Sequence, residues 1–159
     1  MIRFGTVNAS DCIYIAKHMR ERDRREISAV TPHFEPSHFG MYVYRHFEAF
    51  GVAGLIASLE KRPVAVVTLT ADTPRSAQAT MFATDEFDQI GKALTRHMLK
   101  TVLPFVTDKG LTRVEARCWE GHEKARKWME RLGAKQEAVI RGYGANGETF
   151  IQMAWTKCV

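Results

Sequence analysis

A change of period between residues 77 and 105 constrains the fold more than any other stretch of the chain. Small and larger side chains alternate from Ala77 to Ala83, which is the pattern of a β-strand. From Ile90 to Phe105 the apolar residues recur at the spacing of a helix. The stretch therefore predicts a strand that runs into a helix through residues 85–91.

The start of this predicted helix is a candidate binding site for an anion. The first turn of a helix has unpaired backbone N–H groups and a partial positive charge. Gly91 and Ala93 carry little or no side chain, so the backbone of this turn could approach a phosphate closely. An ordinary strand-to-helix connection explains the same residues, and this stretch alone does not decide between the two.

The composition is that of one globular domain. A chain of 159 residues can bury a core without disulfides or metal ions, and 45% hydrophobic with 26% charged residues is typical of a soluble protein. The longest weakly polar runs, residues 51–59 and 63–69, are too short to span a bilayer. The N-terminus does not resemble a signal peptide. We therefore expect a single domain over residues 1–159, in the cytoplasm and without membrane contact.

The cysteines and histidines give no indication of a metal site. Cys12, Cys118 and Cys158 lie far apart and form no C-x-x-C pair, which is typical of a reducing compartment and argues against a disulfide framework or a zinc cluster. The six histidines include no H-E-x-x-H spacing. We expect Cys12 and Cys118 to be buried as small apolar side chains.

The positive charge leaves two classes of anionic ligand open. The net charge is +5, with a pI near 9.3. Residues 17–26 interleave bases with acids, which is typical of a solvated helix face, and a second interleaved set follows His122. A highly negative cofactor would suit this surface about as well as DNA would.

The remaining patterns predict the order of the elements. Asn8 with Asp11 is typical of a capping box at a helix start, and Asp23 with Glu26 repeats it. The aromatic-rich segment 36–50 predicts a helix whose rings pack in the core, with an acceptor pocket as the alternative. We expect strands at residues 2–7, 51–59, 64–70, 77–83, 111–118, 136–142 and 148–156, and helices after Asn8, Asp23, Pro36, Asp88 and His122, the fourth of them bent at Pro104.

This order predicts an α/β (α+β) fold, with a mixed, mostly antiparallel sheet of about six or seven strands and helices on both faces. The strands that begin at Ala77 and Leu111 should be parallel neighbours, because a helix connects them. If these two strands part at their C-terminal ends, they leave a slot beside Asp88 that a ligand could enter.

Residues 88–93, Asp-Gln-Ile-Gly-Lys-Ala, resemble a signature of the GNAT superfamily of acetyl-CoA-dependent N-acetyltransferases. In that signature a Gln or Arg is followed by Gly three positions later and by Gly or Ala two positions after that, at the start of the helix after the fourth strand. Gly91 and Ala93 match it, whereas Asp88 stands where the family has Gln or Arg.

A second resemblance follows at residues 122–134, where the family has Asn, Ala, often Tyr, and then Gly-Phe. Ala125 and Gly133 match by spacing, whereas His122, Met129 and Ala134 replace the Asn, the Tyr and the Phe. The resemblance covers most of the chain, and the chain looks most like small GNAT-like proteins of tailed phages and prophages.

The resemblance implies acetyl-CoA (CoA) as cofactor, an amine as acceptor, and a set of site residues. We expect Glu86 to act as the general base and Tyr143 as the general acid, since Met129 cannot donate a proton. A solvated loop carboxylate and a turn aromatic are the respective alternatives. The cofactor-binding residues expected from the resemblance are Phe82, Ala83, Thr84, Gln89, Ile90, Gly91, Lys92, Ala93, His122 and Trp128.

Three functions are consistent with the sequence. The first is an acetyl-CoA-dependent N-acetyltransferase that modifies an amine of a small molecule or a protein. The second is a GNAT fold without catalysis that serves as a structural or host-interaction module, with a protein partner, a phage particle or a second copy of the chain, in the host cytoplasm or the virion. The third, supported only by the charge, is a nucleic-acid-binding protein.

Overall fold

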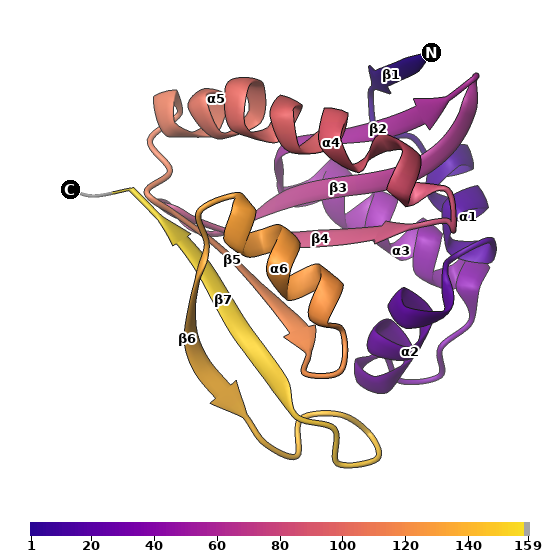
Figure 1. The fold of residues 1–159 in the computed structure, drawn as a ribbon, viewed down its shortest axis with the longest axis vertical. Coiled ribbons are helices and arrows are strands. Elements are labelled where there is room, and N and C mark those ends of the chain that lie inside the picture. Colours follow the sequence, from indigo (N-terminus) through magenta and orange to yellow (C-terminus); the bar gives the residue numbers. More distant parts are fainter. Residues whose placement is uncertain (158–159) are drawn as a thin grey trace.

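Seven strands form one mixed sheet at the centre of the computed structural model, which describes residues 1–157 (Figure 1). The strand order is β1-β2-β3-β4-β5-β7-β6, and every neighbouring pair is antiparallel except β4 and β5. The predicted sheet, mostly antiparallel with one parallel pair, is confirmed. The strands are β1 (Ile2–Gly5), β2 (Gly51–Leu59), β3 (Arg62–Thr73), β4 (Ser76–Ala83), β5 (Arg113–Trp119), β6 (Lys135–Ile140) and β7 (Phe150–Thr156).

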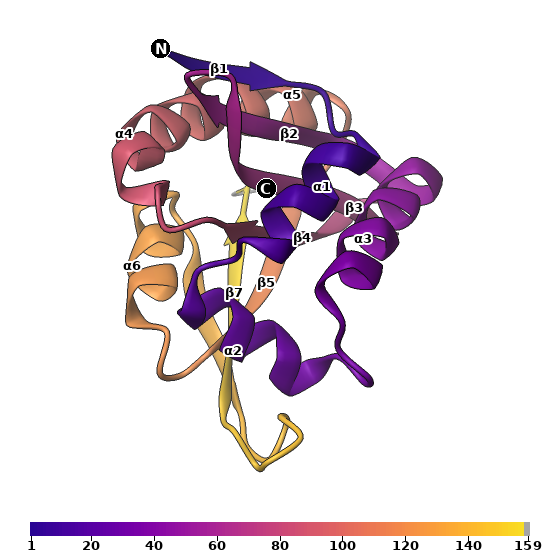
Figure 2. The same ribbon diagram turned by 90° about the vertical axis from the view of Figure 1, so that its right-hand side faces the viewer.

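Helices cover both faces of the sheet (Figures 1 and 2). One face carries α4 (Phe87–His97), a π-helical turn η1 (Met98–Val102), α5 (Leu103–Asp108) and α6 (Glu123–Arg131). The other face carries α1 (Ala9–Lys17) and α3 (Pro36–Phe50). The remaining helix, α2 (Glu21–Val30), lies at the end of the sheet, beside the C-terminal ends of β4 and β5.

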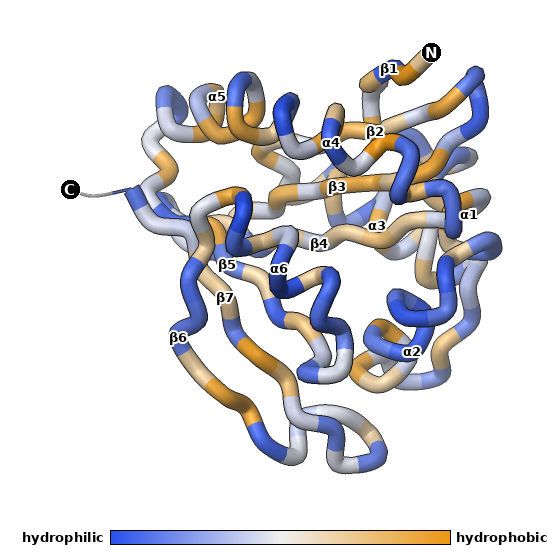
Figure 3. The backbone as a smooth tube through the Cα atoms, viewed as in Figure 1, coloured by the Kyte–Doolittle hydropathy of each residue, from blue (hydrophilic) through white to orange (hydrophobic). Residues whose placement is uncertain are grey.

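The core is divided by the sheet, because alternate strand residues point to opposite faces. Along β4, Ala77 and Ala83 pack beneath α4, whereas Phe82 packs with Val43 of α3 and Ile15 of α1. The hydropathy colouring shows the apolar stretches running along β2, β3 and β7, with polar stretches on the outer helices (Figure 3). Both described cysteines are buried as predicted, Cys12 beneath α3 and Cys118 beneath α6.

Some element boundaries and roles differ from the prediction. The Asn8–Asp11 cap is confirmed, with the Asp11 N–H donating to Asn8 Oδ1 at 2.9 Å. The second predicted cap is wrong: α2 begins at Glu21, two residues before Asp23, and Asp23 is buried rather than solvated. The Asp23 carboxylate is buried against the Ala83 N–H of β4, which is 60 residues away along the chain, and local spacing does not report such a partner.

Two other differences concern α4 and α3. Helix α4 begins at Phe87, so Gly91 lies inside the helix rather than in the turn before it. Of the α3 aromatics, Phe39 packs against Phe82 at a ring distance of 5.2 Å, but Tyr42 and Phe50 are exposed, so core packing holds only for part of that set. No helix among residues 1–157 is both long and apolar enough to cross a bilayer.

Candidate ligand-binding site

The parallel strands β4 and β5 part soon after they pair. Their pairing comprises Ser76 with Arg113, Ala77 with Val114 and Gln78 with Glu115, and it stops there. Residues 79–83 of β4 therefore have no partner strand on the β5 side. Because a parallel ladder uses backbone N–H and C=O groups on that side, the parting leaves backbone polar groups facing an open space.

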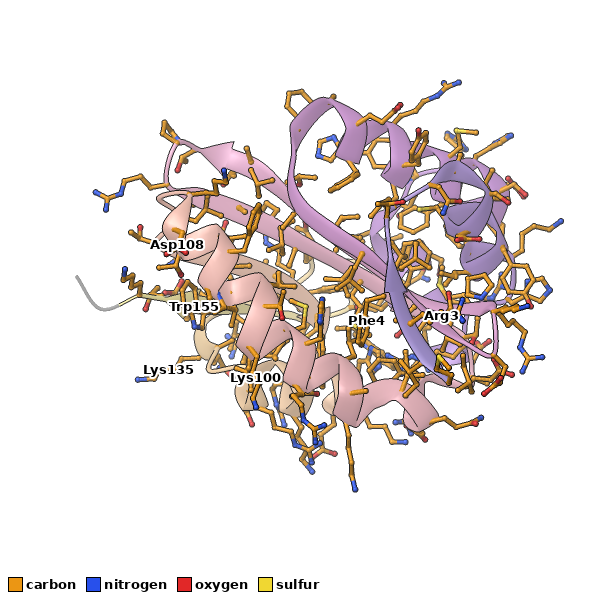
Figure 4. All side chains as sticks on the ribbon, turned by 90° about the horizontal axis from the view of Figure 1, so that it is seen from above. Arg3, Phe4, Lys100, Asp108, Lys135 and Trp155 are labelled. Carbon is orange, nitrogen blue, oxygen red and sulfur yellow. The ribbon has the colours of Figure 1, made fainter. Side chains whose placement is uncertain are left out.

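This space is a cleft with a cavity volume of about 150 Å³. Its floor comes from β3, β4, β5 and β7, and its walls from α4, η1 and α6. Trp155 of β7, which lies between Asp108 and Lys135 in Figure 4, lines it too. Apolar side chains make up most of the lining: Val67, Leu69, Ala79, Met81, Phe87, Met98, Leu103, Val114, Ala116, Cys118, Ala125, Trp128, Met129, Leu132, Ala134, Met153 and Trp155.

Aromatic side chains join the helices across the outer part of the cleft. The ring of Phe87, at the start of α4, meets the ring of Trp128 on α6 edge-to-face at a centroid distance of 6.1 Å. Trp128 Nε1 donates to Thr95 Oγ1 at 2.8 Å, and the Arg20 guanidinium lies 4.6 Å from the Phe87 centroid. Together these four side chains link α2, α4 and α6.

Helix α2 joins the two parted strand ends. Asp23 Oδ2 accepts a hydrogen bond from the Ala83 N–H of β4 at 2.9 Å and another from Arg20 Nε at 2.8 Å. Glu26 Oε2 accepts from the Trp119 N–H of β5 at 2.8 Å. A hydrogen bond from a backbone N–H to a buried carboxylate is strong because it is charge-assisted. The distance between the strand ends is therefore fixed by one turn of helix.

His122 lies between the two α2 carboxylates. Its side chain is 2% exposed, its Nδ1 is 3.2 Å from Glu26 Oε2, and its Nε2 is 3.5 Å from Asp23 Oδ1. Nε2 has no hydrogen-bond partner within the described part of the chain. Because α6 begins at the next residue, the ring also lies where the α6 wall of the cleft starts.

A second hollow, of about 240 Å³, adjoins the cleft at the start of α4. Its positive charges come from Arg20, the residue just before α2, from Arg22 of α2 and from Lys124 of α6, and its negative charges include Asp85 and Asp88. Lys124 Nζ lies 3.7 Å from Asp88 Oδ2, and both side chains are largely exposed. We refer to this space as the outer hollow. It combines cations of two helices at the mouth of the cleft.

The turn that begins α4 pairs most of its own N–H groups. The Phe87 N–H donates to Thr84 O at 3.1 Å, and the Gln89 N–H donates to Glu86 O at 3.0 Å. A phosphate-binding helix start offers such groups to the ligand instead. Gly91 lies inside α4, and a Cβ built at Gly91 would meet the Phe87 ring at an ordinary 3.5 Å. The structure therefore shows no close contact at this position that would require a glycine.

Of the predicted cofactor-binding residues, His122 and Trp128 line the cleft and the others do not. The side chains of Phe82 and Ile90 are fully buried in the core on opposite faces of the sheet. Ala83 uses its N–H for Asp23 and its C=O for the Arg20 N–H. The remaining predicted residues lie in or just before α4: Thr84, Gln89, Gly91, Lys92 and Ala93.

Neither predicted catalytic residue lines the cleft. Glu86 forms an ion pair with Arg62 at 2.6 Å, at the β2–β3 turn. The Tyr143 hydroxyl accepts from Arg117 Nη1 at 2.8 Å, in the loop between β6 and β7. Their catalytic roles stay predictions that this placement does not support.

Cys118 lines the cleft, yet its thiol is unsuited to act as a nucleophile. Burial, with a smaller contribution from the nearby Glu26 carboxylate, raises the pKa of the Cys118 thiol to about 12. A thiol must be ionised to attack a carbonyl carbon. The Cys118 thiol is therefore protonated near neutral pH and is not a ready nucleophile.

The sequence reading missed the α2 side chains that shape the site. The charge pattern of residues 17–26 predicts a solvated helix face, and the spacing of Asp23 and Glu26 predicts a helix cap, so neither indicates a place at the cleft. These two carboxylates and Arg20 follow one another at three-residue spacing, which places them along one helix face, and Asp23 shares that face with the buried Ile27. This spacing is the signal that could have identified them.

The fold is that of known N-acetyltransferases. The ribosomal-protein-S18-alanine N-acetyltransferase of Escherichia coli superposes with a TM-score of 0.72 at 13% identity, covering 100% of this chain and 96% of its own. The candidate acetyltransferase yncA of Salmonella typhimurium, solved with its cofactor acetyl-CoA, gives 0.76 at 11% identity over 98% and 94%. The ribosomal-protein-S5-alanine acetyltransferase of Vibrio fischeri gives 0.69 at 18% identity over 98% and 92%.

At these identities the likeness shows the fold, which is that of the GNAT acetyltransferases. No protein-family model and no curated protein matches the sequence. The function must therefore be argued from the cleft itself.

Proposed function

We propose that the protein is an N-acetyltransferase that binds acetyl-CoA in the cleft between β4 and β5 and transfers the acetyl group to an amine of a small molecule or protein. The observation that carries this proposal is the parting of the parallel strands after Gln78 and Glu115 over an apolar cleft. An extended amide-containing arm can pair with unpartnered backbone groups of a strand as another strand would. The acetyl-CoA-bound neighbour has the same fold.

The cleft residues fit the pantetheine arm of acetyl-CoA. Met81 has the same strand parity as Ala83, whose N–H and C=O both point to the α2 side, so its backbone also points toward the parting. An N–H there can donate to a thioester carbonyl oxygen and stabilise the charge that develops on it. The apolar side chains around it exclude water, which strengthens that hydrogen bond.

The start of α4 does not fit the diphosphate, whereas the outer hollow does. The turn already pairs most of its own N–H groups, and Asp88 would repel an anion placed against it. Arg22 and Lys124 are exposed cations on α2 and α6 at the mouth of the cleft. We therefore assign the diphosphate to these two side chains in place of the backbone of the helix start.

A catalytically inactive binding module is the second candidate. The Phe87–Trp128 contact spans the outer cleft, and Met129 offers no proton where the family often has Tyr. A protein of this kind would act through a partner surface, in a phage particle or on a host protein, and would show no response to acetyl-CoA. The net charge of +5 is the observation that favours nucleic acid, but the basic residues alternate with acidic residues on the same helices.

Thermal unfolding with and without acetyl-CoA, with CoA and ATP as controls, tests the proposal. A ligand at a hundredfold excess over its dissociation constant stabilises the folded state by about 2.7 kcal/mol. For a chain of this size the midpoint should rise by about 5 to 10 °C. Acetyl-CoA and CoA should produce the shift, and ATP should not. The absence of a shift at millimolar acetyl-CoA would refute the proposal and leave the binding module.

A pair of variants tests whether the ligand binds in the cleft. Ala116 of β5 lines the cleft, whereas Ala138 of β6 is exposed on an edge strand. Ala116→Leu should remove the acetyl-CoA shift because the added methyl groups occupy the path of the arm. Ala138→Leu adds the same volume outside the cleft and should retain the shift.

A further inference from the structure

His122 is the buried polar side chain whose hydrogen bonding is least complete. Its Nε2 has no partner within the described residues although the side chain is 2% exposed. Buried polar atoms in native proteins are almost always paired, so an unpartnered one needs an explanation. His122 lines both the cleft and the outer hollow, so its ring borders both spaces.

The carboxylates on either side of the ring are held in place by the parted strands. Glu26 Oε2 lies 3.2 Å from His122 Nδ1 while it also accepts the Trp119 N–H. Asp23 Oδ2 is occupied by the Ala83 N–H and by Arg20, and its other oxygen lies 3.5 Å from Nε2. Glu26 thus favours the tautomer with the proton on Nδ1, and Nε2 then has no hydrogen-bond donor among the described residues and lies 3.5 Å from Asp23 Oδ1.

This arrangement is that of a general base oriented by a carboxylate. A carboxylate on Nδ1 fixes the tautomer and the orientation of an imidazole whose Nε2 exchanges a proton with the reacting groups. Three neighbouring side chains that line the cleft are poor alternatives. Met129 and Met153 carry no exchangeable proton, and burial keeps the pKa of the Cys118 thiol far above neutrality.

We propose that His122 carries the proton in the acyl transfer reaction and that Glu26 is its positioning residue. This inference rests on the proposed function of the cleft. Nε2 accepts the proton that the amine nitrogen loses as its bond to the carbonyl carbon forms. Nε2 then donates that proton to the sulfur, which takes the electron pair of the breaking C–S bond. One amide and one thiol are formed, and the imidazole returns to its starting state.

The kinetic test uses His122→Gln, which keeps a polar side chain but cannot shuttle a proton. The probes are acetyl-CoA and an amine panel of spermidine, polylysine and a peptide with a free α-amine. The variant should keep the unfolding midpoint within a few degrees and the acetyl-CoA affinity within about threefold. Its rate of CoA release with the best amine should fall by about 10² to 10⁴, the usual contribution of general acid–base catalysis. His38→Gln, at a side chain that is 88% exposed, is the matched control and should react normally.

A second readout is independent of turnover. In ¹⁵N spectra of the imidazole rings, the signals that vanish in His122→Gln identify the residue. They should show a proton on Nδ1, and the Nε2 signal should shift when acetyl-CoA is added. Glu26→Gln should weaken the tautomer preference and alter the pH dependence of the rate, since the Gln oxygen can still accept the Trp119 N–H.

The outcomes separate this inference from the proposed function. If the wild-type protein neither binds acetyl-CoA nor releases CoA, the proposed function fails, and with it the reaction that His122 would serve. If the wild-type protein is active and His122→Gln keeps more than a tenth of the rate, only the role of His122 is refuted. The role is also refuted if the variant loses stability and affinity while its rate per bound complex is unchanged, because His122 would then only join α2 to β5.

Discussion

Gly91 is the residue at which two interpretations of α4 make opposite predictions. If the helix start were a phosphate cradle, Gly91 would be needed for close approach of the ligand, and a side chain there would weaken binding. The structure places Gly91 inside α4, with space for a methyl group against the Phe87 ring at 3.5 Å. Gly91→Ala should therefore leave the acetyl-CoA affinity unchanged.

The same substitution should stabilise the fold. Replacing a helix-interior glycine by alanine removes backbone freedom from the unfolded chain and contributes about 0.5 to 1 kcal/mol. For a chain of this length the unfolding midpoint should rise by about 1 to 4 °C. The Gly91 carbonyl accepts from Thr95 Oγ1 at 2.7 Å, and this hydrogen bond does not involve the new methyl group.

Denaturant unfolding and calorimetric titration with acetyl-CoA measure both quantities. Gly110→Ala is the matched control, because Gly110 has open space around it but a φ of +95°, which strains a residue with a Cβ. It should lower the midpoint where Gly91→Ala raises it. A lower midpoint for Gly91→Ala, or a tenfold loss of acetyl-CoA affinity, would show that the helix start approaches a ligand after all.

Three further predictions follow from buried or charged groups. Asp23→Ala leaves the Ala83 N–H and Arg20 without their carboxylate and should cost about 3 to 5 kcal/mol, or about 6 to 20 °C in the midpoint, while Glu21→Ala on the exposed side of α2 should cost little in the same melts. Asp88→Gln removes an acid from the mouth of the cleft and should tighten acetyl-CoA binding about two- to fivefold in calorimetric titrations. Burial raises the pKa of Cys12 to about 11 and of Cys118 to about 12, so raising the pH from 7 to 9 should not make either thiol react with a maleimide until the protein unfolds, as mass spectrometry would show.

The sequence was sufficient to predict the sheet because the patterns that indicate its strands and connections are local. The alternation of residues 77–83, the helical spacing after Ile90 and the next strand imply a parallel pair, since a helical connection returns the chain to the same edge of the sheet. The pairing of Ser76 with Arg113 confirms this. The parting of the strands also agrees with the expected slot, because only residues 76–78 of β4 pair with β5.

The shape of the site could not be predicted from local sequence patterns. Asp23 and Glu26 look like solvated helix charges until α2 is placed against the ends of β4 and β5, which lie 60 and 93 residues away along the chain. Likewise, no local pattern predicted the π turn over Met98–Val102, which lies just before Pro104. There the Leu103 N–H bonds to Met98 O, which reorganises the hydrogen bonding just before the proline.

The proposed relocation of the diphosphate has a physical consequence for how the site would bind. Backbone N–H groups at a helix start are fixed dipoles, so binding to them needs little ordering of side chains. Arg22 and Lys124 are long and exposed, so a ligand must immobilise both, and salt screens their charge over a Debye length of about 8 Å at physiological ionic strength. Binding through them should be weaker and more sensitive to salt, and the apolar arm in the cleft must then supply most of the affinity. The cleft, with its walls joined by α2, is therefore the part of the molecule on which the proposed activity depends most.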